Sequence, residues 1–224
     1  MLDRVDFPST YMRIYRGTCL GGGSVVYGAM LPYARPEFWD EYFPFVPYSE
    51  MTNKWYPKVK SVLNFSTVPQ DILDNEVYRF ARVGLKQCEK AGMQKVMLNV
   101  GVNFDTIEGE INGTKKKSAL NTELLYGANN GYKNSLDRNY IPAASATGNL
   151  TIKTLHKVDY VRHLPNDGYE LTVHEINEQG DTIAIKKFTC KHLFVNDGVV
   201  GTMQILLKSK YMGGLANLND EVGK

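Results

Sequence analysis

The chain has 224 residues, of which 43% are hydrophobic and 22% charged, and its formal net charge is +2. This composition is typical of a globular protein, and the length suffices for one large domain or two small ones. The small net charge gives no electrostatic footprint for nucleic acid, so we expect none as a partner. No apolar run approaches the roughly 20 residues of a membrane helix, so we expect no transmembrane segment.

The three cysteines, Cys19, Cys88 and Cys190, are far apart and odd in number. No Cys-x-x-Cys or Cys/His spacing accompanies them, so we expect neither a metal site nor a disulfide framework. The one basic run, at residues 115–117, is short and lies among Gly, Asn and Thr. We interpret it as a solvated loop, with a contact to an anionic partner as the alternative.

In the first part of the chain, the pattern predicts one strand and two helices. Residues 11–17 alternate between apolar and polar, which predicts a strand leading into a glycine-rich segment. Residues 36–43 predict a short helix that opens on a proline. Residues 49–63 predict a second helix with Ser49 as its N-cap and a kink or break at Pro57.

The clearest helix is predicted at residues 74–92, followed by a strand at residues 95–100. Asp74 or Asn75 can cap the start of this helix, and Gly92 can end it. Apolar residues recur on one stripe, which predicts a face buried in the core. The stripe consists of Val77, Ala81, Leu85, Cys88 and Ala91.

Residues 101–134 are rich in Gly and Asn and show no sustained period. A loop of this length in a compact domain is usually functional or packed against another part of the protein. Residues 135–148 then predict a helix that ends at Gly148.

From residue 150 onward, short runs rich in β-branched residues predict an antiparallel meander. The predicted strands lie at 150–155, 156–164, 169–176 and 182–190, with turns at 165–168 and 177–181. Residues 191–207 predict a short apolar strand, a tight turn and an amphipathic helix, a unit typical of an α/β sheet. The expected fold class is therefore α+β, with a mixed or antiparallel sheet against which the helices at 74–91 and 135–147 pack.

Residues 18–31, TCLGGGSVVYGAML, place three consecutive glycines before an apolar run. The segment is not the dinucleotide fingerprint G-x-G-x-x-G, because Val26 occupies the position of its last glycine. It is not a P-loop, because Ala29 and Met30 replace the Lys and the Ser/Thr that hold phosphate and magnesium. Two interpretations remain: a stretch whose main chain a planar ligand approaches, or a plain tight turn between strand and helix.

The stretch GTCLGGGSVVYGAM, with FW and SEM after it, resembles the flavin-contacting segment of the glucose–methanol–choline oxidoreductases, and within them the bacterial cholesterol oxidases. Further stretches resemble the same family in the same order, over essentially the whole chain. They are YRFARVGLKQCEKAG, KSALNTELLYGANNGYKNSLDRNYIPAA, GNLTIKTLHKVDYVR, DGYELTV and GGLANLNDEVG. The resemblance implies that FAD lies in an extended groove, with a sterol or other alcohol over the flavin, which accepts a hydride.

The resemblance also implies cofactor contacts in the glycine segment. Gly22 and Gly23 would pass close to the flavin and its ribityl chain, and Gly28 and Met30 would border the isoalloxazine ring. Tyr27 stands where the family usually has Asn beside the flavin. Its ring could turn into the core, fill the space of the cofactor, or stack on the isoalloxazine.

Two more contacts are implied in the second half of the chain. The backbone of Val158 matches the position that contacts the adenine, and Asn196 lies in the turn beside the cofactor diphosphate. There NDG at 196–198 replaces the family's small glycine–alanine–glycine turn. Asp197 would bring a negative charge near the diphosphate unless its side chain points away.

By this resemblance the chain is an internal fragment, because the family's G-x-G-x-x-G unit would precede Met1 and its catalytic His and partner Asn would follow Lys224. The opening residues show no apolar leader and no strand that could nucleate a sheet. Residues 1–35 and 149–224 would be pieces of the FAD-binding domain, and 36–148 a portion of the substrate-binding domain. No catalytic residue is expected in the chain, since none of its histidines matches the catalytic position. These are His156, His163, His174 and His192.

The implied function is that of an FAD-dependent oxidoreductase acting on CH–OH groups, of cholesterol-oxidase type, with a small alcohol or sterol as substrate. As a fragment, the chain alone is expected to be inactive, and its partners would be the missing N- and C-terminal segments of the same fold. The alternative is a non-catalytic remnant or binding module that retains the substrate-domain core.

Overall fold

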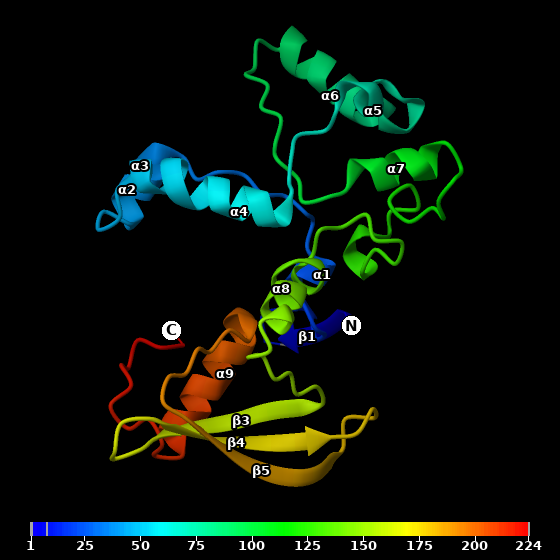
Figure 1. Cartoon of the computed structure of the whole chain (residues 1–224). Helices are drawn as coiled ribbons and strands as arrows, with labels where there is room; N and C mark the ends of the chain where they lie inside the picture. Colours follow the sequence, from blue (N-terminus) through cyan, green and yellow to red (C-terminus); the bar gives the residue numbers. More distant parts are fainter. Residues whose placement is uncertain (1, 8, 224) are drawn as a thin grey trace. The chain divides into compact units, whose positions relative to one another are not determined.

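The computed structural model describes residues 2–7 and 9–223. It divides into two compact units, Met1–Leu150 and Thr151–Lys224, each of which is described by itself. Helices accompany two small antiparallel sheets, which confirms the predicted α+β class (Figure 1).

The first unit opens with an antiparallel pair of strands, β1 (Leu2–Phe7) and β2 (Met12–Gly17). The predicted strand at 11–17 is confirmed by β2. The expectation that no strand precedes it is wrong, because β1 pairs with β2 along its whole length. Apolar residues in β1 do not alternate strictly, so the period-2 signal was missing.

Two short helices follow, α1 (Gly23–Val26) and α2 (Pro36–Tyr42). The helix predicted at 36–43 is confirmed by α2, with Pro36 in its first turn, where the missing N–H costs no hydrogen bond.

The helical run predicted at 49–63 is present but changes type along its length. It consists of α3 (Tyr48–Glu50), the π-helix η1 (Met51–Trp55) and α4 (Tyr56–Leu63). The run does not break at Pro57, because the wider π turn precedes the proline, which then lies in the first turn of α4. Ser49 is not the N-cap, since the helix begins one residue earlier and Pro47 precedes it.

The helix predicted at 74–92 is divided into three parts. They are α5 (Gln70–Asp74), the 3₁₀-helix η2 (Glu76–Tyr78) and α6 (Arg79–Lys90). Asn75 caps η2 by accepting a 3.2 Å hydrogen bond from the Val77 N–H, and Gly92 ends α6 with a φ of +65°. Both predicted caps are thus confirmed.

The predicted core stripe of this helix is wrong. No residue of α6 is buried, and Leu85 and Cys88 are only half-buried, while Val77 is exposed. Among the elements of its unit, α6 packs against α5 and η2, which cover little of its surface. The apolar period therefore predicted the helix correctly but not its burial.

The strand predicted at 95–100 is also wrong, because of these six residues, all described, only Val100 has bridge partners, Met30 and Ser66. Extended segments meet here at single bridges instead of forming a ladder. The region predicted as a loop contains a helix, α7 (Phe104–Ile111), and a 3₁₀-helix, η3 (Glu123–Tyr126).

The helix predicted at 135–148 is shorter and interrupted. It consists of the 3₁₀-helix η4 (Leu136–Arg138) and α8 (Tyr140–Ala146). Pro142 explains the late start of α8, because proline is tolerated only in the first turn of a helix. The predicted end is confirmed by Gly148, whose φ is +73°.

The core of the first unit lies where these segments meet. Its buried members are Ala29, Ile72, Val102, Ile107, Ala128 and Tyr132. The core thus joins the end of the glycine segment to α5, α7 and the loop before η4.

The second unit contains the predicted meander (Figure 1). Its strands are β3 (His156–His163), β4 (Tyr169–Ile176) and β5 (Thr182–Cys190), in the order β3-β4-β5. The turns at 165–168 and 177–181 are confirmed. The strand predicted at 150–155 is wrong, because this stretch forms no ladder in the described structure and only its last residue, Leu155, accepts a backbone hydrogen bond from β4.

The helix α9 (Gly198–Tyr211) packs along β3. The strand predicted before it is absent from residues 191–197 as described, so no α/β-type unit forms here. Instead, the hydroxyl of Ser209 accepts a 2.8 Å hydrogen bond from the Val161 N–H, and the His163 N–H donates to the Gly214 carbonyl at 3.0 Å. The outer edge of β3 is thereby covered, which satisfies backbone groups that an edge strand would leave open.

Candidate functional site

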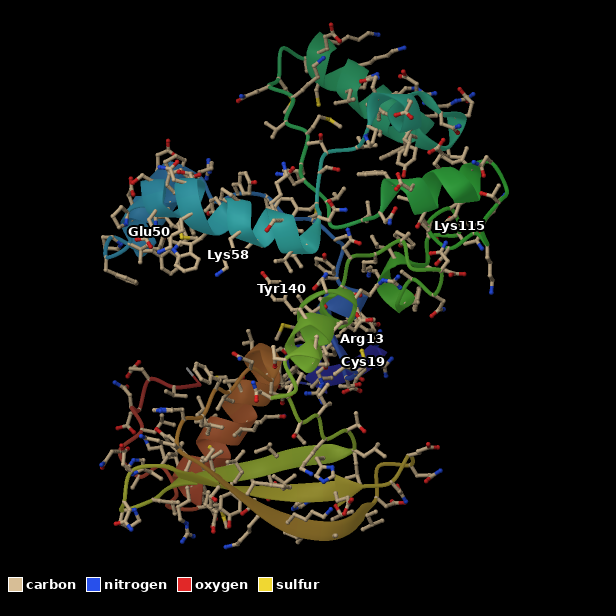
Figure 2. All side chains as sticks on the ribbon, in the orientation of Figure 1. Arg13, Cys19, Glu50, Lys58, Lys115 and Tyr140 are labelled. Atoms are coloured by element: carbon tan, nitrogen blue, oxygen red, sulfur yellow. The ribbon has the colours of Figure 1, made fainter. Side chains whose placement is uncertain are left out.

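The glycine segment follows β2 directly, and Cys19 marks its start (Figure 2). Two glycines, Gly17 at the end of β2 and Gly21 in the segment, are required by the packing of the chain itself. A Cβ on Gly17 would lie 2.3 Å from the Gly22 carbonyl oxygen, and one on Gly21 would lie 2.8 Å from the Val25 side chain. Gly21 and Gly22 also have positive φ values of 90° and 54°, which favour glycine.

Gly23 and Gly28 have no such internal reason. Neither has a positive φ, a Cβ on Gly23 would meet nothing within 4 Å, and one on Gly28 would meet only the flexible end of Met30 at 3.9 Å. A Cβ on Gly22 would also point into open space. Beyond their own chain neighbours and helix, the Cβ positions of these three glycines thus meet no atom of the described residues closer than 3.9 Å, which leaves room beside the main chain for a ligand.

The end of the segment is fixed by neighbouring backbone. Ala29 is buried with a φ of +58°, and its carbonyl accepts a 2.7 Å hydrogen bond from the Gly101 N–H. The Leu31 N–H donates to the Asn99 carbonyl at 2.9 Å. Because Ala29 turns inward, its neighbour Met30 is left 61% exposed beside the open face of Gly28.

Tyr27 packs toward the core, unlike the open glycines on either side of it. Its side chain is half-buried and packs against the core of the first unit, and its hydroxyl would be only 2.5 Å from a Cβ on Gly101. Burial raises the pKa of the Tyr27 phenol. Of the three alternatives for this ring, the structure favours packing in the core.

Lys133 binds the backbone of the glycine segment through its ammonium. The sequence did not predict this contact. Its side chain is 2% exposed, and its ammonium donates to the carbonyls of Val25 at 2.8 Å, Tyr27 at 2.9 Å and Leu124. Burial lowers the pKa of Lys133 to about 8. The lysine lies in a stretch of Gly and Asn, which gives no periodic signal of burial.

A second buried charge, Glu110 in α7, holds the loop that leads to Lys133. Its carboxylate accepts hydrogen bonds from the N–H groups of Ser118, Ala119 and Leu120 at 2.9–3.0 Å, and from the Asn130 amide. Desolvation alone would raise the pKa of Glu110, but these donors outweigh it and hold the pKa below its ordinary value.

The basic run predicted as a solvated loop lies in the same loop. Residues 115–117 are all exposed, in agreement with that interpretation. Lys115 folds back onto α7 (Figure 2), where its ammonium is 3.4 Å from the Thr106 hydroxyl.

The two remaining implied contacts lie in the second unit. Val158 is in β3, next to a register shift in its pairing with β4, and Asn196 is exposed before α9. The carboxylate of Asp197 turns over the first turn of α9, since a Cβ on Gly201 would lie 1.9 Å from its Oδ2. The five implied residues of the glycine segment therefore lie together, whereas Val158 and Asn196 belong to a separate compact unit.

Three of the four histidines make contacts within the second unit. The Nδ1–H of His156 donates to the Thr154 carbonyl at 2.7 Å, and His174 Nε2 lies 3.6 Å from the Asp159 carboxylate. His163 packs edge-on against Tyr169. Over residues 2–7 and 9–223, no three His, Cys, Asp or Glu side chains are grouped so as to hold a metal ion.

The described part of the chain also offers no helix with the length and apolarity to cross a membrane. The three cysteines are free thiols.

No protein-family model matches the chain. Among curated proteins, the chain is 25% identical over 239 residues to a cholesterol oxidase from Acinetobacter baumannii. The match covers 95% of this chain but only 41% of that protein, so the chain spans less than half the length of this relative. The chain is therefore distantly homologous to part of an oxidoreductase.

Proposed function

We propose that this chain forms part of an FAD-dependent oxidoreductase of cholesterol-oxidase type, which oxidises the CH–OH group of a sterol or another alcohol. The observation that carries the proposal is the match to the cholesterol oxidase along 95% of the chain. In this proposal residues 1–35 and 149–224 belong to the FAD-binding domain, and 36–148 to the substrate-binding domain.

The openness of the glycine segment supports the proposal of a flavin beside it. Gly22, Gly23 and Gly28 present bare main chain to open space, and Met30 is exposed beside them. Next to the glycine turn, the buried Oδ1 of Asp137 has no hydrogen-bond partner in the described residues, and such an acceptor suits a ligand that carries hydroxyl groups. When bound, FAD supplies the ring that accepts the hydride.

The chain's own residues would bind and orient that group. In the first unit the glycines admit the ring and Met30 borders it, with Tyr27 supporting the segment from the core side. In the second unit the Val158 backbone would contact the adenine, and Asn196 would lie beside the diphosphate. Asp197 disfavours an anion at this position, which is the observation that supports the alternative of a non-catalytic remnant.

The test is a chimera in which this chain replaces the matching part of the Acinetobacter baumannii cholesterol oxidase. We expect the chimera to carry the yellow flavin absorbance and to form peroxide with a sterol or a simpler alcohol, and the chain alone to do neither. A folded chimera that takes up no FAD would support the remnant instead.

Matched glycine variants then test the site. Gly23→Val and Gly28→Val should lower flavin occupancy of the chimera, because a side chain would stand between the ring and the main chain. Gly84→Val is the control, since Gly84 in α6 also has an open Cβ position and no positive φ. Full occupancy in all three variants would contradict the proposed flavin contact.

A further inference from the structure

We propose that Lys133 is a positioning residue, whose ammonium fixes the flavin-facing segment by holding the carbonyls of Val25 and Tyr27 together with that of Leu124. This role rests on the function proposed above. The hydrogen bonds of the Lys133 ammonium go to main-chain carbonyls, so the lysine acts through the backbone of the segment.

The contacts of Lys133 match an ammonium closely. The group has three N–H donors and no acceptor, and three carbonyl oxygens surround it. No carboxylate in the described residues forms an ion pair with it, although the Tyr27 ring lies 5.4 Å from its nitrogen. The charge is thus balanced by backbone dipoles, which ties the position of the ammonium to the positions of those carbonyls.

Two of these carbonyls bracket the point at which α1 ends and the chain turns toward Gly28. The third, from Leu124 in η3, belongs to the loop that Glu110 holds. Lys133 itself is anchored by a bridge between its backbone and Val102 in the core. The lysine therefore links the glycine segment, which forms no β-ladder of its own, to the core and to this loop. These links restrict the motion of the segment's backbone.

The first test needs no flavin and uses the chain as it is. Hydrogen exchange is measured for Lys133→Met, which keeps the apolar stem but removes the donors, and for Lys117→Met on the exposed basic run as a control. We expect amides at 24–31 to exchange at least about tenfold faster in Lys133→Met and to be unchanged in Lys117→Met. Unchanged exchange in Lys133→Met, or equal acceleration throughout the first unit, would overturn the positioning role.

A measurement on the unmodified chain covers the case in which Lys133→Met does not fold. Lysine acetylation is followed by mass spectrometry, and Lys133 should react at least about tenfold more slowly than Lys117. Equal labelling of the two lysines would overturn the proposal.

The link to flavin is tested in the chimera. Lys133→Met should weaken FAD affinity more than Leu63→Ala, a cavity variant of a buried residue in α4, with the melting temperatures of both variants measured alongside. Equal affinities would overturn the positioning role. A chimera that binds no FAD at all would contradict the proposed function, while the exchange result on the chain alone would stand.

Discussion

The two compact units hold their backbones in different ways. In the second unit, β3, β4 and β5 pair along almost their full lengths, and α9 covers the edge of β3. In the described residues of the first unit, beyond the β1–β2 pair, extended segments meet only at single bridges, and two buried charges, Glu110 and Lys133, hold several backbone groups each. Where no ladder satisfies the backbone, a few side chains do so, and each becomes individually important.

The comparison predicts the largest loss of unfolding free energy for Glu110→Ala. The variant leaves the buried N–H of Ser118 and the half-buried N–H groups of Ala119 and Leu120 without their charged acceptor, which should lower the free energy of unfolding by about 3–5 kcal/mol. Both tryptophans, Trp39 and Trp55, lie in the first unit, so urea unfolding followed by tryptophan fluorescence measures this loss.

Glu108→Ala is the matched control, because Glu108 is exposed on the same helix and should cost less than about 0.5 kcal/mol. The lowered pKa of Glu110 adds a pH dependence: its contribution is complete above the pKa of the unfolded chain and is lost as the pH falls through the folded-state pKa. Equal losses of unfolding free energy in the two variants would show that the hydrogen bonds of Glu110 do not stabilise the loop.

The second effect concerns pH and Lys133. Burial lowers the pKa of Lys133 from 10.5 to about 8, so between these values the unfolded chain binds more protons than the folded chain. The free energy of unfolding should therefore rise as the pH increases from about 8 to 10.5, by at most about 3 kcal/mol. Urea unfolding at several pH values should show this rise in the parent and not in Lys133→Met; parallel curves would refute it.

A smaller effect is expected in the second unit for Ser209→Ala. The Ser209 hydroxyl is fully buried, accepts from the Val161 N–H and donates to the Ile205 carbonyl at 2.6 Å. Its loss leaves one N–H of β3 unpaired, at a cost of about 1–3 kcal/mol. The measurement is thermal unfolding by circular dichroism, with the exposed Gln204→Ala on the same helix as control. A loss of unfolding free energy as large as that of Glu110→Ala would contradict the claim that single side chains matter more in the first unit than in the second.

The smallest effect is expected for Gly23→Ala, which should change the free energy of unfolding by less than about 1 kcal/mol, because its Cβ position is open and its φ is ordinary. Gly21→Ala should destabilise more, since it meets both a positive φ and the Val25 side chain. Thermal unfolding of the two variants tests the claim that the fold requires Gly21 and does not require Gly23. A large loss of unfolding free energy in Gly23→Ala would show that the fold itself requires this glycine. Gly23 would then no longer support a ligand at the segment.

The sequence predicted the features that depend on neighbouring residues. The cap at Asn75 and the helix end at Gly92 follow from local backbone chemistry, and the meander follows from alternation and turn residues between adjacent strands. For the candidate site, the sequence located the glycine segment and excluded two phosphate-binding motifs, but it did not separate Gly21, required by packing, from Gly23, which is not.

Tertiary structure alone decided the rest. The runs at 95–100 and 150–155 have strand-like composition, yet a strand exists only where a partner supplies hydrogen bonds, and their partners offer single contacts. The charge of Lys133 is buried because backbone carbonyls distant in sequence converge on it, 108 positions away for Val25 and 106 for Tyr27. The charge of Glu110 is buried because a loop 8 to 10 positions further along the chain folds back and donates three N–H groups to it. Such convergence leaves no local pattern, so the residues that hold the glycine segment became visible only in the folded chain.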